Sequence, residues 1–137
     1  MKKLIIFIVS GMLLLASGAA ANTKILLEEC YDNRDPIGEI SFYIFDINLN
    51  NNKVIEIDIL TDRGTKSLTG RSKTHKNEYE IKLVNDAYIE AIWIGRVQSD
   101  KLDIFLKDKK VTRTVTNYIE NKPFIEREFK CKKISYK

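Results

Sequence analysis

The chain has 137 residues, a formal net charge of +4, one histidine and two cysteines. A single histidine excludes a His-rich metal site, and it leaves a Ser-His-Asp triad only one candidate base, His75. The sequence also lacks a phosphate-binding glycine pattern and a Cys-x-x-Cys motif. We therefore expect a protein that is not an enzyme and that carries neither a cofactor nor a metal ion.

The N-terminus has the pattern of a secretory signal peptide. Lys2 and Lys3 precede an apolar run over residues 4–15, and small residues fill positions 16–21. We predict a signal peptide over residues 1–21, a single β domain over residues 22–137 and a periplasmic or secreted location. The alternative is an uncleaved membrane anchor, for which the apolar segment has borderline length. Loss of the two lysines lowers the net charge from +4 to +2, which argues against a nucleic-acid partner.

The two cysteines, Cys30 and Cys131, lie near opposite ends of the predicted mature chain. An even cysteine count in an exported protein favours a disulfide bond. A metal site needs more ligands, and a redox pair is usually closely spaced. Cys131 has the same strand parity as Phe129, so its sulfur is expected to point inward and to join the first and last strands.

Alternating apolar and polar residues predict strands along most of the chain. The clearest signal is a hairpin over residues 39–61, with its turn at Asn50-Asn51-Asn52, because asparagine tolerates the backbone of tight turns. The other predicted strands cover residues 23–31, 66–69, 78–83, 88–94, 101–107, 111–119 and 124–134. Short turns separate them, and no long helix is expected after the signal peptide. The pattern predicts an all-β antiparallel meander of seven to eight strands, forming a small barrel or a sandwich.

Candidate site residues are few, and each also has an ordinary structural explanation. The exposed basic segment between two predicted strands is the candidate binding loop, because loops on a rigid scaffold often carry function. Its residues are Arg71, Ser72, Lys73, His75 and Lys76.

Three acidic residues and one tryptophan in the predicted strands are also candidates. Glu56 and Asp58 alternate with isoleucines, so we expect them on a solvated outer face. Asp46 is expected to cap a turn at a strand end rather than to lie inside. Trp93, the only tryptophan, is expected in the core.

Two classes of function are favoured, and a purely structural envelope protein stays open as a further alternative. The first is a non-enzymatic binding or inhibitor module that acts on an envelope or extracellular protein. The segments Leu68-Thr69-Gly70-Arg71-Ser72 and Trp93-Ile94-Gly95, with Tyr79, are faintly similar to periplasmic lysozyme inhibitors, but the small-residue loop of that family is absent. The second is a lipocalin-like carrier that encloses a small apolar ligand in its barrel. We expect no stable membrane span once the signal peptide is removed.

Overall fold

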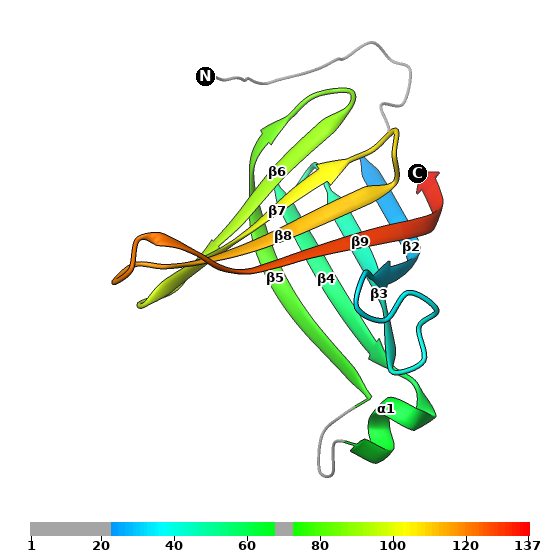
Figure 1. Ribbon diagram of the computed structural model, residues 1–137. Coiled ribbons are helices and arrows are strands. Elements are labelled where there is room, and N and C mark those ends of the chain that lie inside the picture. Colours follow the sequence, from blue (N-terminus) through cyan, green and yellow to red (C-terminus); the bar gives the residue numbers. More distant parts are fainter. Residues whose placement is uncertain (1–22, 68–72) are drawn as a thin grey trace.

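The computed structural model describes residues 23–67 and 73–137. The predicted signal peptide, together with Arg71 and Ser72 of the candidate binding loop, lies outside these residues. Eight strands form one closed barrel in which each strand pairs with its neighbours in sequence, and the last strand pairs with the first (Figure 1). They are β2 (Lys24–Asp32), β3 (Ser41–Asn48), β4 (Lys53–Leu60), β5 (Thr74–Val84), β6 (Tyr88–Ile94), β7 (Gln98–Phe105), β8 (Lys110–Asn117) and β9 (Lys122–Tyr136).

All eight strand pairings are antiparallel. The predicted all-β meander is therefore confirmed, and the structure selects the barrel over the sandwich. Because the ladder closes on itself, most of the wall has no unpaired strand edge. The predicted hairpin of residues 39–61 forms β3 and β4, and Asn52 in its turn has a φ of 60°, as its residue type allows.

The barrel interior is apolar toward the end at which β2 begins. Aromatic and aliphatic side chains from all eight strands fill it, and the largest of them are fully buried. These large residues are Tyr79, Phe45, Phe129, Leu27, Ile47, Ile89, Leu102 and Ile104. The ring of Phe129 packs edge-on against those of Tyr43 and Phe45, with centroid distances of 4.6 and 5.4 Å. This half of the barrel is thus a packed core.

Cys30 and Cys131 form the predicted disulfide bond between β2 and β9. They stand directly opposite each other in the ladder that closes the barrel. A bulge in β2, with Glu29 at a φ of 52°, lets both Leu27 and Cys30 point inward although three positions separate them. Simple alternation could not have predicted this change of face.

A short helix, α1 (Asp62–Ser67), follows β4. The hydroxyl oxygen of Thr61 accepts a hydrogen bond from the amide of Gly64 at 3.1 Å, which is the N-cap interaction of a helix start. Gly64 packs against residue 40 so closely that a Cβ would lie 2.2 Å from the carbonyl oxygen of Ile40. The prediction of a strand over residues 66–69 is wrong for Lys66 and Ser67, which belong to this helix, and its other two residues lie outside the described chain.

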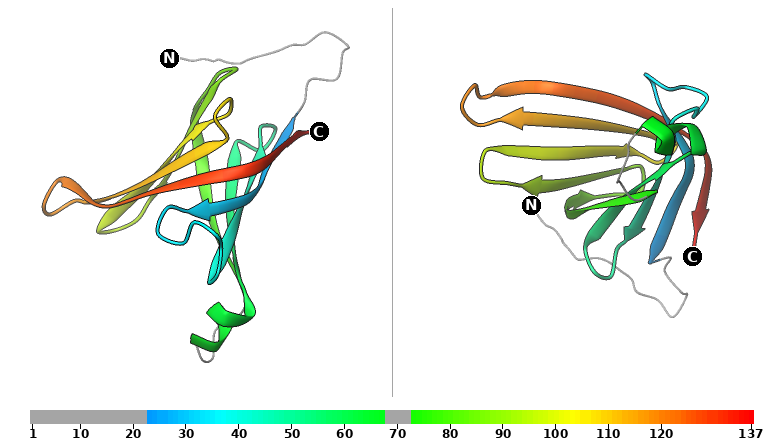
Figure 2. Two further views of the ribbon diagram at one scale, coloured as in Figure 1. Left: turned by 45° about the vertical axis from the view of Figure 1, so that its right-hand side comes forward. Right: turned by 90° about the horizontal axis from the view of Figure 1, so that it is seen from below.

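The barrel wall is not uniform toward the α1 end. The ladder between β5 and β6 begins only at Glu80 and Ile92, whereas β5 itself starts at Thr74. Figure 1 and the left view of Figure 2 show β5 continuing toward α1 while β6 and the following strands turn away from it. The wall therefore opens between these two strands.

Candidate functional site

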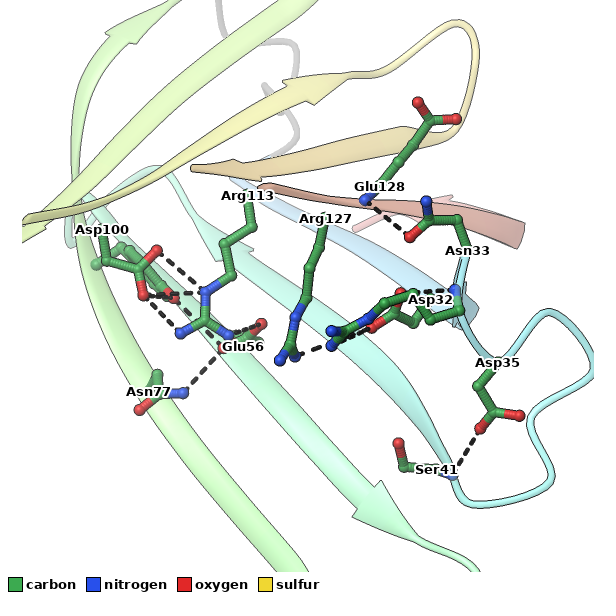
Figure 3. A network of polar contacts seen from close by, with 12 residues as sticks. Asp32, Asn33, Asp35, Ser41, Glu56, Asn77, Asp100, Arg113, Arg127 and Glu128 are labelled. Atoms are coloured by element: carbon green, nitrogen blue, oxygen red, sulfur yellow. Dashed lines mark hydrogen bonds and ion pairs between the residues drawn. The ribbon is translucent and has the colours of Figure 1, made fainter. Parts of the chain in front are cut away.

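Charged side chains occupy the barrel interior toward the α1 end. They project from five strands and share the inward face of the wall; Figure 3 labels all of them except Asp58. We call them the charged layer: Asp32, Glu56, Asp58, Asp100, Arg113 and Arg127. Four carboxyl groups and two guanidinium groups are thus gathered in a part of the barrel where sequence reasoning placed apolar side chains.

Arg113 on β8 binds Asp100 on β7 through a two-nitrogen fork. Its Nη2 donates to Asp100 Oδ2 at 2.6 Å, and its Nε lies 3.0 and 3.1 Å from the two carboxylate oxygens. Arg113 Nη1 also lies 3.7 Å from Glu56 Oε2. Burial by itself would lower the pKa of Arg113, but the bond to Asp100 and the charge of Glu56 raise it overall. This guanidinium therefore stays charged and holds two carboxyl groups in place.

Glu56 on β4 has a side chain that is 1% exposed. Its Oε1 accepts a hydrogen bond from Asn77 Nδ2 at 2.9 Å, and the hydroxyl of Tyr79 lies 3.3 Å away. Its other oxygen, Oε2, has no hydrogen-bond donor among the described residues. Burial raises the pKa of Glu56, although the charge of Arg113 and the bond from Asn77 oppose the shift.

Tyr79 links the two carboxyl groups of this cluster. Its hydroxyl lies 3.3 Å from Glu56 Oε1 and 3.2 Å from Asp100 Oδ2, yet it has only one proton to donate. Burial, followed by the charge of Glu56, raises the pKa of Tyr79, so the phenol keeps that proton. The single hydroxyl proton of Tyr79 can therefore be donated to Glu56 or to Asp100, but not fully to both at once.

Arg127 on β9 forms the second part of the charged layer. It stands directly opposite Arg113 in the ladder, an arrangement that would be repulsive if each arginine lacked its own carboxylate. Arg127 Nη1 lies 3.8 Å from Asp32 Oδ2, which also lies 3.6 Å from Arg34 Nη2. Arg127 Nε and Asp58 Oδ1 are buried without a hydrogen-bond partner in the described structure. Burial raises the pKa of Asp58, against the opposing effects of His75 and Ser41.

An open groove of about 760 Å³ reaches the charged layer where β5 and β6 separate. This volume lies within the range of roughly 300–1,000 Å³ that is typical of ligand sites. We call it the β5–β6 groove. It is lined by Lys53, Lys76, Asn77, Glu78, Tyr79, Glu80, Ile92, Trp93, Ile94, Gln98, Asp100 and Arg113.

Trp93 forms part of the β6 wall of this groove. Trp93 is 46% exposed, so the expectation that it lies in the core is wrong. The indole extends over Gly95, where a Cβ would come within 2.4 Å of the ring. The absence of a side chain at Gly95 therefore gives the indole its space beside the groove.

The candidate binding loop is divided by the structure. His75 and Lys76 belong to β5 rather than to a loop, and only Lys73 of the described members precedes that strand. His75 is exposed, and Lys76 lines the β5–β6 groove. The loop assignment is therefore wrong for His75 and Lys76, but Lys76 does lie at the groove.

Sequence alternation misplaced the acidic residues of β4. Glu56 and Asp58 point into the barrel instead of facing solvent, and the neighbouring isoleucines face outward. Asp46 lies within β3, on the outer face, and its Oδ2 is 3.8 Å from Lys24 Nζ. A usable signal was present at Arg113, which shares the strand face of Val111 and Val115, both buried. An arginine on an apolar face needs an acidic partner, and that requirement points to inward carboxylates elsewhere.

Comparison with known proteins adds no further assignment. No protein family, curated protein or solved structure matches this chain. Within residues 23–67 and 73–137, no three His, Cys, Asp or Glu side chains are grouped in a way that could hold a metal ion. The same part of the chain contains no helix that is long and apolar enough to cross a membrane.

Proposed function

We propose that this protein is a non-enzymatic binding module of the periplasm or extracellular space, and that it binds a partner protein in the β5–β6 groove. The observation that carries the proposal is the opening in an otherwise closed barrel wall. Through it, a solvent-accessible groove leads to a cluster of buried charges that fixed hydrogen bonds hold in position. Binding surfaces commonly combine an aromatic side chain with a few oriented polar groups, and Trp93, Asn77 and Gln98 supply that combination here.

The same geometry favours a binding module over a carrier of a small apolar ligand. The apolar half of the interior is filled by Phe45, Tyr79 and Phe129, which are at most 1% exposed. The groove is lined mainly by charged and amide side chains. An apolar ligand in it would have to desolvate these groups without replacing their hydrogen bonds.

The disulfide bond supports the proposed location. Cys30 and Cys131 are joined, and such bonds persist in oxidising compartments such as the bacterial periplasm. The bond ties together the two strands that close the barrel. A scaffold that is closed in this way holds the groove walls in place before a partner arrives, which lowers the entropic cost of binding.

Site-specific photo-cross-linking in the native host tests the proposal. A benzophenone amino acid would replace Ile94 of β6, which is exposed in the groove wall. In a matched strain it would replace Val84, an exposed aliphatic residue at the end of β5 that does not line the groove. We expect a discrete protein adduct from position 94 that is absent from position 84. Replacing Trp93 with alanine should abolish the adduct. Equal adducts at both positions, or none at position 94, would contradict the proposal.

A further inference from the structure

We propose that the β5–β6 groove receives an extended peptide segment, which adds as a strand to the edge of β5 at Lys76 and Glu78, where no described strand pairs on the β6 side, and points a basic side chain into the barrel. This inference rests on the proposed binding function and specifies the chemistry of the partner. Three features of the structure lead to it: the unpaired edge of β5, the excess of carboxyl groups in the charged layer, and the apolar character of the β6 wall.

The first feature is the direction of the backbone groups of β5. The amide of Ile81 donates to Asn52 and that of Leu60 donates to Lys73, which identifies the odd-numbered residues of β5 as those bonded to β4. The even-numbered residues therefore direct their N–H and C=O groups toward β6. The ladder with β6 reaches Glu80 and goes no further toward α1, so the groups of Lys76 and Glu78 face the groove. A short unpaired edge of this kind is the template that strand addition uses.

The second feature concerns a side chain that such a strand would direct inward. A residue placed beside Asn77 would enter the mouth of the charged layer, where four carboxyl groups face two arginines. Glu56, which stands opposite Asn77 in the β4–β5 ladder, lies behind the groove lining and is 1% exposed; its Oε2, 3.7 Å from Arg113 Nη1, has no hydrogen-bond donor among the described residues. The indole of Trp93 stands on the other wall, and aromatic faces attract cations. A guanidinium group offers several donors and a positive charge, so arginine meets all of these requirements.

The third feature is the outer rim of the groove, which would meet the residues on either side of that arginine. On the β5 side, Lys76 and Glu78 carry opposite charges, and Glu78 already pairs with Lys53 at 3.0 Å. On the β6 side, Ile92 and Ile94 are aliphatic, and Ile94 is 66% exposed. The rim thus has no net charge to attract an ion and offers apolar contact. The segment that fits best has a basic residue between two aliphatic ones.

Synthetic peptides test these assignments directly. The probe is acetyl-Ser-Thr-Val-Arg-Val-Thr-Ser-amide, and the matched controls replace its arginine with citrulline, which is neutral and of the same shape, or with glutamate. Because Trp93 is the only tryptophan and lines the groove, its fluorescence reports binding without a label. We expect the arginine peptide to bind about tenfold more tightly than the citrulline peptide, as loss of a charged hydrogen-bond donor predicts. Glutamate should bind more weakly still.

Substitutions in the protein distinguish the contribution of the β5 backbone from that of the buried carboxyl groups. Glu78→Pro removes an N–H that faces the groove without removing a bond to β4, whereas Glu78→Ala keeps that N–H and serves as the control. We expect Glu78→Pro to bind all three peptides about tenfold more weakly than Glu78→Ala, because both variants lose the Glu78 side chain and only the proline variant also loses the N–H. Glu56→Gln should erase most of the difference between arginine and citrulline. Should the proline variant fold poorly, a peptide N-methylated at both valines tests strand addition on the native protein, because it lacks the N–H groups that would bond to β5.

The results distinguish this inference from the function on which it rests. Equal binding of the arginine, citrulline and glutamate peptides would overturn the basic-residue assignment. Unchanged binding of the N-methylated peptide would overturn strand addition. If the photo-cross-link at position 94 still forms in the host, either of these two results would leave the groove as the binding site. The partner would then be recognised by a different chemistry. Loss of that adduct would remove the proposed function itself.

Discussion

Replacing Arg113 with glutamine should destabilise the barrel strongly at neutral pH. Arg113 holds Asp100 through a two-nitrogen fork and lies 3.7 Å from Glu56, so its loss leaves two buried carboxyl groups without their cation. Breaking a buried ion pair on one side typically costs about 3–5 kcal/mol. Because the Arg113 side chain is 21% exposed, solvent screening reduces this figure, and we expect a loss of about 2–4 kcal/mol.

The matched control is Arg34→Gln, which removes an exposed cation outside the charged layer that lies beside one of its members, Asp32. The Arg34 side chain is 61% exposed and lies 3.6 Å from Asp32, so its removal should cost less than about 1 kcal/mol. Urea unfolding with the disulfide intact, followed by circular dichroism and Trp93 fluorescence, measures both variants. For a slope of about 1–3 kcal/mol per molar, Arg113→Gln should lower the midpoint by roughly 1–3 M.

The pH dependence of this difference provides the refuting test. Burial raises the pKa of Glu56, so Glu56 takes up a proton early as the pH falls, and the cost of leaving it without Arg113 then shrinks. The gap between Arg113→Gln and the native protein should therefore be smaller at pH 3 than at pH 7. Equal midpoints for the Arg113 and Arg34 variants at pH 7, or the same gap at both pH values, would refute the ion-pair reasoning.

Three further predictions follow from the fold and the sequence. Because the folded pKa of Glu56 is raised, its carboxyl group stabilises the fold below its ordinary value of about 4.3, and this contribution is lost as the pH rises through the folded value. Glu56→Gln, which does not titrate, should therefore gain stability relative to the native protein as the pH rises from about 4 through the raised pKa of Glu56. A difference in urea midpoint between the two proteins that does not change with pH would contradict this. Replacing Cys30 and Cys131 together with alanine should lower the free energy of unfolding by about 4–5 kcal/mol, because the bond closes a loop with a sequence separation of 101, and an unchanged melting temperature would contradict this. Intact mass of the protein from its own host should correspond to a chain that starts at Asn22 and gains two thiols on reduction, whereas a mass that retains Met1 would exclude signal cleavage.

Local sequence patterns were sufficient for the strands and turns of most of the barrel. The asparagine turn between β3 and β4 and the alternation in β7 were predicted because backbone preference and period-two burial act within a few residues. The inward direction of Cys131 beside Phe129 was predicted for the same reason. The region from Asp62 to Lys76 was predicted less well, since α1 depends on a cap from Thr61 and on close packing of Gly64 against residue 40.

The candidate site could not be predicted to the same extent. Hydrophobic alternation assigns the isoleucines of β4 to the inside, yet Glu56 and Asp58 lie there because Arg113, Tyr79 and Asn77 come from other strands to receive them. Such an arrangement depends on contacts between residues that are far apart in sequence, and a single-strand pattern contains no information about them. Trp93 was misplaced for the same reason, since its exposure follows from the separation of β5 and β6.

By itself, then, the sequence determined the strand content, the order of the turns, the cysteine pairing and the expectation of export, because local propensity, period and residue counts suffice for these. Only the tertiary structure decided that the sheet closes, that charged side chains fill one end of its interior and that the wall opens beside β5. The physical reason is that a buried charge is stable only where its partners converge, and that convergence is a property of the closed barrel rather than of any one strand.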